Sequence, residues 1–188
     1  VCADRVKGVR RLQQLFPDLQ CVILDDAYQH RSLCCGMYVL LTPYDCLYVH
    51  DHMLPWGRLR DLPNQSIRAN LVVVTKCPKN MLPIDRRVVA NELQLPAYQQ
   101  LVFSHIAYKQ LSLPGTPLLV TGIANPKPML AYLREQYPNT ELLSFPDHHM
   151  FTNQDIKNIL SRAKDYACVV TTEKDYMRLR QTSLVEQL

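Results

Sequence analysis

Glycine is scarce in this chain, which has only 5 glycines among 188 residues. They stand at Gly8, Gly36, Gly57, Gly115 and Gly122. No two of them have the spacing of a Gly-x-Gly-x-x-Gly or a Gly-x-x-x-x-Gly-Lys-Ser/Thr motif, in which backbone N–H groups surround phosphates. Taken alone, the chain therefore holds no glycine-rich phosphate loop.

Other features are missing too, and each excludes a class of protein. No apolar run approaches the roughly 18 residues that predict a membrane-spanning helix, and no signal peptide opens the chain. The formal net charge of +4 would suit an anionic ligand or a membrane surface, but it is too small to predict nucleic-acid binding. The 7 cysteines are odd in number and lack Cys-x-x-Cys spacing, which favours a reduced, cytosolic-facing compartment.

What is present is a regular alternation of short apolar runs and amphipathic stretches. Strands are expected at residues 21–24, 37–41, 71–74, 118–120, 142–145 and 167–170. Helices are expected at 9–16, 84–93, 126–137, from Thr152 to about residue 163, and after Asp175; residues 98–113 are expected to be extended. This order predicts parallel β-α units and therefore an α/β fold.

Polar clusters follow four of these expected strands: Asp25-Asp26, Thr75-Lys76, residues 147–149 and residues 172–175. In a parallel sheet, the carboxyl ends of the strands line the ligand crevice, so these clusters are candidate site residues. An apolar strand that ends in paired carboxylates is the Walker B arrangement, which holds Mg²⁺ beside a nucleotide. The alternative is a helix cap or turn, where Asp is also common.

Two further groups of residues could carry chemistry. Asp147-His148-His149 places a carboxylate beside imidazoles that could transfer a proton, or His148 could be a loop histidine bonded to backbone. No histidine spacing matches a zinc site. Arg58 and Arg60, near Trp56, could bind phosphate through paired N–H groups, or could form a solvated basic face.

Six motifs in a fixed order carry a family resemblance across nearly the whole chain. They are Asp25–Arg31, Leu54–Asp61, Arg68–Asn70, Thr121–Pro126, Phe145–Phe151 and Thr172–Asp175. Each motif alone is weakly specific, but together the series resembles the tetraacyldisaccharide 4'-kinases, the lipid A 4'-kinases.

The resemblance implies a parallel-sheet fold like that of P-loop kinases, acting with ATP and Mg²⁺ on the 4'-hydroxyl of a lipid A disaccharide precursor. It implies that Asp25 and Asp26 hold the Mg²⁺-nucleotide, with Gln29 and His30 in the cofactor site. It also implies catalytic roles for His148, Asp147, Arg60 and Asp61. The family's usual Asp-Asp-Gly-Phe-Gln-His has Ala27 and Tyr28 here, and its Leu-Arg-Glu-Pro has Asp61 in place of Glu.

The resemblance also sets expectations for organisation. We expect part of a P-loop kinase domain at residues 1–97, an extended linker at 98–116 and a small α/β domain at 117–188. The family's P-loop, its catalytic-base aspartate and its membrane-associating helix are expected upstream of Val1, so the 188 residues alone are expected to be soluble and to show negligible kinase activity. The intact protein would act at the cytoplasmic face of the inner membrane.

Two other readings remain open from the residues. The same strand-end side chains could form a non-catalytic α/β module that binds an acidic small molecule. The chain could also be a gene remnant without function, although its strands and helix caps are intact.

Overall fold

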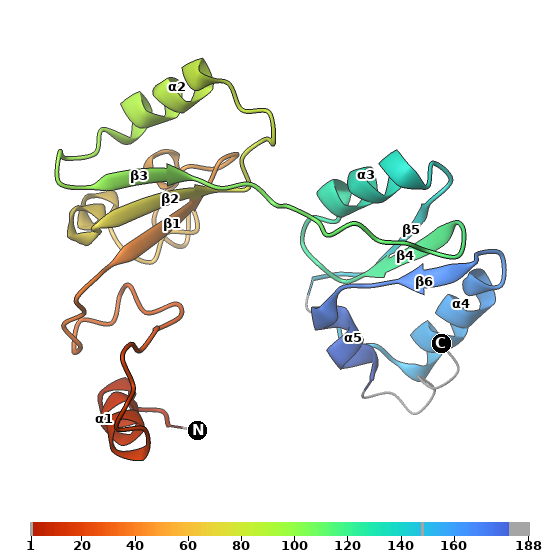
Figure 1. Cartoon of the computed structure of the whole chain (residues 1–188), viewed down its shortest axis with the longest axis horizontal. Coiled ribbons are helices and arrows are strands. Elements are labelled where there is room, and N and C mark those ends of the chain that lie inside the picture. Colours follow the sequence, from red (N-terminus) through yellow and green to blue (C-terminus); the bar gives the residue numbers. More distant parts are fainter. Residues whose placement is uncertain (1, 148, 181–188) are drawn as a thin grey trace. The chain divides into compact units, whose positions relative to one another are not determined.

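The computed structural model describes residues 2–147 and 149–180. Contacts divide the chain into two compact units, residues 1–107 and residues 108–188. Each unit contains a three-stranded sheet in which all paired strands run parallel (Figure 1). The α/β fold with parallel pairing, which the alternating pattern predicts, is confirmed.

The first sheet has the strand order β1-β2-β3. Its strands are β1 (Val39–Pro43), β2 (Leu71–Thr75) and β3 (Gln100–Phe103). Val72 and Val74 of β2 are fully buried, and helix α2 (Pro83–Leu93) packs Val89 and Leu93 into the same core. One face of this sheet is therefore covered.

The opposite face of the first sheet is largely open. Leu41 of β1 pairs with Val73 of β2, which pairs with Val102 of β3, so the three side chains form one row across the sheet. Leu41 is 63% exposed and Val102 is 45% exposed. All-parallel sheets normally have both faces covered, so this open apolar face is unusual.

The segment before the first sheet differs from expectation. Helix α1 spans Arg5–Leu15, close to the expected helix, but no strand forms at residues 21–24. Ile23 is 89% exposed, and no backbone hydrogen bond of a described residue pairs this run with a strand. A strand needs a neighbour for its N–H and C=O groups, and apolar sequence alone does not supply one.

Two short 3₁₀ helices complete the first unit. They are η1 (Tyr48–His50) and η2 (Pro63–Arg68), and they flank the loop that contains the Leu54–Asp61 motif. The chain then leaves β3 without regular structure until β4, so residues 104–116 are extended or irregular while residues 100–103 belong to the sheet.

The second sheet has the order β5-β4-β6 and helices on both faces (Figure 1). Its elements are β4 (Pro117–Thr121), α3 (Lys127–Gln136), β5 (Glu141–Ser144), α4 (Asn153–Ala163), β6 (Cys168–Val170) and α5 (Glu173–Leu179). Every residue of the central strand β4 is buried, as expected for a covered parallel strand.

Helix α4 begins with a reciprocal cap between Thr152 and Asp155. The Thr152 hydroxyl accepts a hydrogen bond from the Asp155 N–H at 3.2 Å, and the Asp155 carboxylate accepts one from the Thr152 N–H at 2.8 Å. Helix α5 begins in a similar way, because Thr172 accepts a hydrogen bond from the Asp175 N–H at 3.1 Å. The bonds at both helix starts satisfy backbone N–H groups that a helix leaves unpaired there.

Candidate functional site

In the first unit, the structure brings together residues from two separate motifs. Asp26 and Arg60 form an ion pair across 34 positions of sequence. The Arg60 Nη1 donates to Asp26 Oδ2 at 3.0 Å, and Nη2 donates to Oδ1 of the same carboxylate. Such a two-point contact fixes the relative orientation of a guanidinium and a carboxylate.

Asp26 sits in an uncommon backbone conformation. Its φ is 49°, in the left-handed region that non-glycine residues rarely adopt, although Asp tolerates it better than most. The pKa of its carboxyl is lowered from the ordinary value, chiefly because Arg60 donates hydrogen bonds to it. Burial is the next largest effect and acts in the opposite direction, while the charges of Arg60 and Arg5 lower the pKa further. Asp26 is therefore held in its ionised form.

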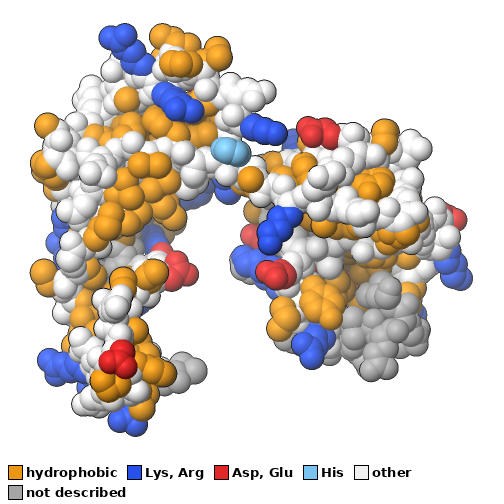
Figure 2. Space-filling view, in the orientation of Figure 1, with side chains coloured by type: hydrophobic (Ala, Val, Ile, Leu, Met, Phe, Trp, Pro, Cys, Tyr) orange, Lys and Arg blue, Asp and Glu red, His pale blue; other side chains and the backbone are white. Residues whose placement is uncertain are grey.

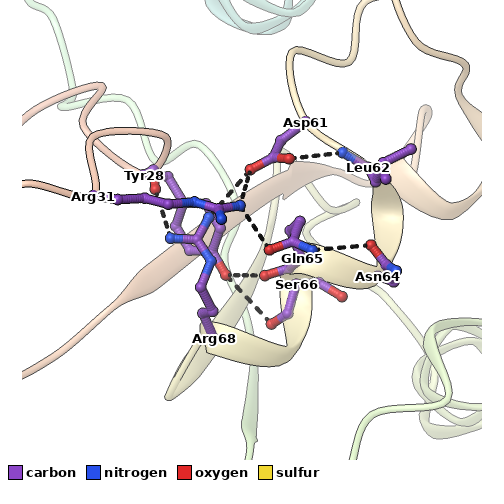
Figure 3. A network of polar contacts seen from close by, with 8 residues as sticks. All are labelled: Tyr28, Arg31, Asp61, Leu62, Asn64, Gln65, Ser66 and Arg68. Atoms are coloured by element: carbon purple, nitrogen blue, oxygen red, sulfur yellow. Dashed lines mark hydrogen bonds and ion pairs between the residues drawn. The ribbon is translucent and has the colours of Figure 1, made fainter.

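Asp61, the neighbour of Arg60, lies in a second cluster (Figure 3). Its Oδ2 is 3.2 Å from the Arg68 Nη2 and 3.5 Å from the Arg31 Nη2. Arg68 also donates to the Tyr28 backbone carbonyl at 3.0 Å, and its guanidinium lies 4.5 Å from the centre of the Tyr28 ring. Asp61 thus ties the residue 25–31 loop to helix η2 rather than pointing alone into solvent.

A third link joins the same two segments. The Tyr28 hydroxyl donates to the Gln65 carbonyl at 2.9 Å, and Arg31 donates to the Gln65 side-chain oxygen at 2.8 Å. Burial raises the pKa of the Tyr28 hydroxyl, which therefore remains a donor at neutral pH. Tyr28 stands where the resembled family usually has phenylalanine, so this hydroxyl contact depends on that departure.

The remaining expected cofactor residues lie on the same loop. Asp25 and Gln29 are exposed, and His30 is partly buried. The His30 Nε2 atom is shielded from solvent and has no hydrogen-bond partner among the described residues. All four of the expected cofactor residues therefore lie within residues 25–30, a loop of two short turns that follows the apolar run.

In the second unit, Asp175 is the centre of a buried polar network. Its side chain is fully buried, and its Oδ2 accepts hydrogen bonds from the Thr121 hydroxyl at 2.9 Å, the Gly122 N–H at 3.0 Å and the Thr172 hydroxyl at 2.7 Å. Arg178 donates to the other oxygen at 3.3 Å. One carboxylate therefore joins the loop after β4 to the start of α5.

The loop after β5 closes against the same network at Gly122. A Cβ atom on Gly122 would lie 3.0 Å from the Pro146 carbonyl oxygen and 3.5 Å from the His149 Cβ. His149 in turn lies 3.0 Å from the Asp155 carboxylate and stacks on the Phe145 ring. Three of the six motifs therefore meet within the second unit, and a side chain at Gly122 would be crowded where they meet.

Two of the expected catalytic residues, Asp147 and His148, belong to the Phe145–Phe151 motif. Asp147 is exposed in the loop after β5, while His148 lies outside the described residues. Of the four polar clusters, those at 25–26 and 75–76 belong to the first unit and those at 147–149 and 172–175 to the second; the cluster at 25–26 follows no strand.

Several of these contacts involve residues to which the sequence assigned no role. Arg68 and Thr121 stand within the family motifs, but the motifs imply no role for them, and Tyr28 differs from the phenylalanine usual in the family. Asp175 carried a local signal, because Thr172 stands three residues before it, as Thr152 does before Asp155. No local signal predicted that its carboxylate would also bind the loop after β4.

The first unit could hold a metal ion only with help from other ligands. Among the described residues, no group of three or more His, Cys, Asp or Glu side chains is placed to bind one. Asp25 and Asp26 offer two carboxylates, and Mg²⁺ is commonly held by one or two carboxylates with the rest of its ligands from phosphate and water. The donor set therefore fits Mg²⁺ bound together with a nucleotide.

Taken together, the two parallel sheets and the polar clusters define an α/β protein whose first unit is consistent with part of a P-loop-kinase-like domain. The sequence model of one family, described as "Tetraacyldisaccharide-1-P 4'-kinase", matches residues 1–188. The chain belongs to this family.

Curated relatives agree with this assignment. A tetraacyldisaccharide 4'-kinase of Flavobacterium johnsoniae is 42% identical over 200 residues, which cover 100% of this chain and 58% of the relative. One from Bacteroides thetaiotaomicron is 39% identical over 203 residues, covering 94% and 53%, respectively. The chain thus spans little more than half the length of these relatives. No solved structure matches the chain.

The described part of the chain contains no helix with the length and apolar character needed to cross a bilayer.

Proposed function

We propose that this chain forms part of an ATP-dependent kinase that phosphorylates the 4'-hydroxyl of a tetraacyldisaccharide 1-phosphate, a lipid A precursor. The pairing of Asp26 with Arg60 is the observation that supports this most directly, because it joins residues of two family motifs in one cluster. The proposed place of action is the cytoplasmic face of the inner membrane, with membrane contact through a segment outside this chain and with no nucleic-acid partner.

In this proposal, Asp25 and Asp26 would hold Mg²⁺ beside the ATP phosphates. Bound Mg²⁺ supplies positive charge that neutralises the transferring phosphoryl group. Arg60 holds the Asp26 carboxylate ionised and oriented, and Asp61 fixes the neighbouring backbone through Arg68. Gln29 and His30 complete the nucleotide side of the site.

The acceptor side of the reaction is proposed to involve the second unit. His148, with Asp147 beside it, would help to remove the proton from the sugar hydroxyl, and a positioned group of this kind typically contributes about 10²–10⁴-fold to rate. Asp175 and Gly122 hold the flanking loops in place. Phosphoryl transfer depends mainly on such positioning and on charge neutralisation.

The test is a chimera in which this chain replaces the matching region of the Flavobacterium johnsoniae relative. We expect it to transfer ³²P from ATP to tetraacyldisaccharide 1-phosphate. Asp26→Asn should lower kcat by about 100-fold or more, because the Mg²⁺-side charge is lost. Asp165→Asn, which changes an exposed carboxyl on the second unit, serves as the matched control and should leave kcat unchanged.

A folded chimera that transfers no phosphate, while the relative does so in the same assay, would contradict the proposal. Equal rates for Asp26→Asn and Asp165→Asn would contradict the role given to Asp26. The alternative, a non-catalytic module that binds an acidic small molecule on the same residues, predicts anion binding without phosphate transfer.

A further inference from the structure

The loop between η1 and η2 presents large apolar side chains to solvent. We call residues 53–56, with the sequence Met-Leu-Pro-Trp, the apolar tip. Trp56 is 85% exposed and Leu54 is 60% exposed. Tryptophan is usually well buried in soluble proteins, so an outward-facing indole on a surface loop points to a binding role.

Trp56 and Leu54 are exposed because they lie on a turn that several hydrogen bonds hold in place. The Asp51 carboxylate accepts hydrogen bonds from the N–H groups of His52 at 2.8 Å and Arg58 at 3.2 Å, and from the Arg58 Nε at 3.1 Å. Backbone bonds of 3.0 Å from Leu54 to Leu59 and from Leu59 to His52 close the base of the turn. The tip therefore projects from a fixed support.

Gly57 makes this turn possible. A Cβ atom at this position would lie 2.3 Å from the His52 carbonyl oxygen and 2.4 Å from an Asp51 carboxylate oxygen. No side chain fits there, so the backbone can fold tightly behind Trp56. The indole and the Leu54 side chain are displayed beyond it.

We propose that the apolar tip inserts into the interfacial zone of a phospholipid bilayer. Tryptophan and leucine are favoured at that depth, where the indole N–H can reach polar groups while the ring contacts acyl chains. Arg58 and Arg60 follow the tip in sequence; each pairs with a carboxylate, Asp51 and Asp26 respectively, while their side chains remain 70% and 52% exposed. The chain's net charge of +4 favours the anionic surface of such a bilayer.

The proposal rests in part on the proposed function, because a tetraacylated substrate resides in a bilayer and the enzyme must reach it there. It differs from membrane contact through a segment outside this chain. It also differs from contact through α1, which exposes Leu12, Leu15 and Phe16 beside basic residues. The tip is distinguished from α1 by its single tryptophan.

Trp56 is the only tryptophan of the chain, so its emission reports on the tip alone. The experiment mixes the 188-residue chain with vesicles of phosphatidylcholine and phosphatidylglycerol, without ATP or substrate. We expect the emission to shift to shorter wavelength and acrylamide quenching to fall as lipid is added. Brominated acyl chains in the same vesicles should quench Trp56 directly.

Two matched variants test the contribution of the tip. Leu54→Ser should weaken vesicle binding by about tenfold, the effect of removing one inserted leucine. Ile84 is equally exposed, at 60%, but belongs to α2 and not to the tip, so Ile84→Ser should bind like the parent chain. Circular dichroism checks that both variants are folded.

Vesicle binding with unchanged Trp56 emission would overturn the proposal, because the contact would then be made elsewhere, as by α1. An absence of binding by the folded chain, or equal losses for Leu54→Ser and Ile84→Ser, would also overturn it. Because the assay contains no nucleotide, the kinase proposal can fail while tip insertion stands, and the reverse outcome is equally distinguishable.

Discussion

Arg60 acts on Asp26 from 34 positions away in the sequence, and the consequence is a carboxyl group with a lowered pKa. We predict that a ¹³C-detected titration of the chain will place the pKa of Asp26 below its ordinary value. In Arg60→Gln the pKa should return towards the ordinary range, because the donated hydrogen bonds are the main cause of the shift. Lys79→Gln, on the same unit but outside this cluster, should leave it unchanged.

The sign of the associated pH dependence follows from the direction of the shift. A pKa lower in the folded state than in the unfolded state means that the Asp26–Arg60 contact favours folding above the unfolded pKa. That contribution is lost as the pH falls through the folded-state pKa. Because both side chains are largely exposed, solvent screens the effect and we expect it to be small. A pKa for Asp26 equal to that of a free aspartate would contradict this account.

Glycine positions give a second prediction for single residues. Gly57→Ala should lower the free energy of unfolding of the first unit by about 1–3 kcal/mol, because the new methyl carbon would lie 2.3 Å from the His52 carbonyl oxygen. Gly36→Ala is the matched control, since nothing lies within 4 Å of a Cβ there. Urea denaturation of both variants measures the difference, and equal midpoints would contradict the packing argument.

Helix starts and loops in the second unit depend on one buried carboxylate. Asp175→Asn should lower the free energy of unfolding of this unit by about 3 kcal/mol. Asparagine keeps only one acceptor oxygen: if that oxygen takes the place of Oδ2 and accepts from Thr121, Gly122 and Thr172, the amide NH₂ group faces the Arg178 donor, and in either orientation the negative charge is lost. Asp165→Asn changes an exposed carboxyl after α4 and should cost less than about 0.5 kcal/mol.

Guanidinium denaturation followed by the ¹⁵N-¹H signals of the second unit would measure this effect. The prediction fails if Asp175→Asn and Asp165→Asn unfold at the same denaturant concentration. A loss of stability confined to the first unit would also contradict it, because the hydrogen bonds of Asp175 described above all lie within the second unit.

At the level of elements, sequence predicted most strands well because apolar runs in parallel sheets are nearly continuous. Residues 71–74 and 118–120 became the central strands β2 and β4. Residues 21–24 have the same character but formed no strand, because strand formation depends on a partner that no local pattern reveals. The α4 cap was predictable since its two partners lie three residues apart.

The candidate site was predictable only in its components. The paired aspartates and Arg60 could be named from motifs, but their contact joins distant positions and required the fold. The role of Tyr28 as a donor to Gln65, and the multiple bonds of Asp175, depend on loops whose geometry has no periodic signal. The family resemblance identifies the motifs and their order along the chain. Only the structure shows which motifs are in contact with each other.

For the whole molecule, the division into two units predicts that the second can fold by itself. Residues 108–113 contact α3 and the residue after it. The rings of Tyr108 and Tyr132 stack with their centres 4.8 Å apart, and the Leu113 N–H donates to the Tyr137 hydroxyl at 2.9 Å. A fragment of residues 108–188 should therefore give a dispersed ¹⁵N-¹H spectrum that overlays on part of the full-chain spectrum.

A shorter fragment of residues 117–188 provides the comparison. It keeps the sheet and all three helices but loses the contacts of Tyr108 and Leu113, so it should unfold at lower temperature than the longer fragment. Melting of both fragments by circular dichroism measures the difference. A collapsed spectrum for residues 108–188, or identical melting of the two fragments, would contradict the boundary.

The open face of the first sheet has a practical consequence for handling the protein. Patches of hydrophobic side chains are visible at the surface in Figure 2, and Leu41 and Val102 are among the exposed residues of β1 and β3. Strand β1 is also an outer strand of its sheet, and residues 37–42 carry no charge. Uncharged edge strands pair readily with other copies of a chain, so the working concentration of the purified protein will be limited by self-association through β1.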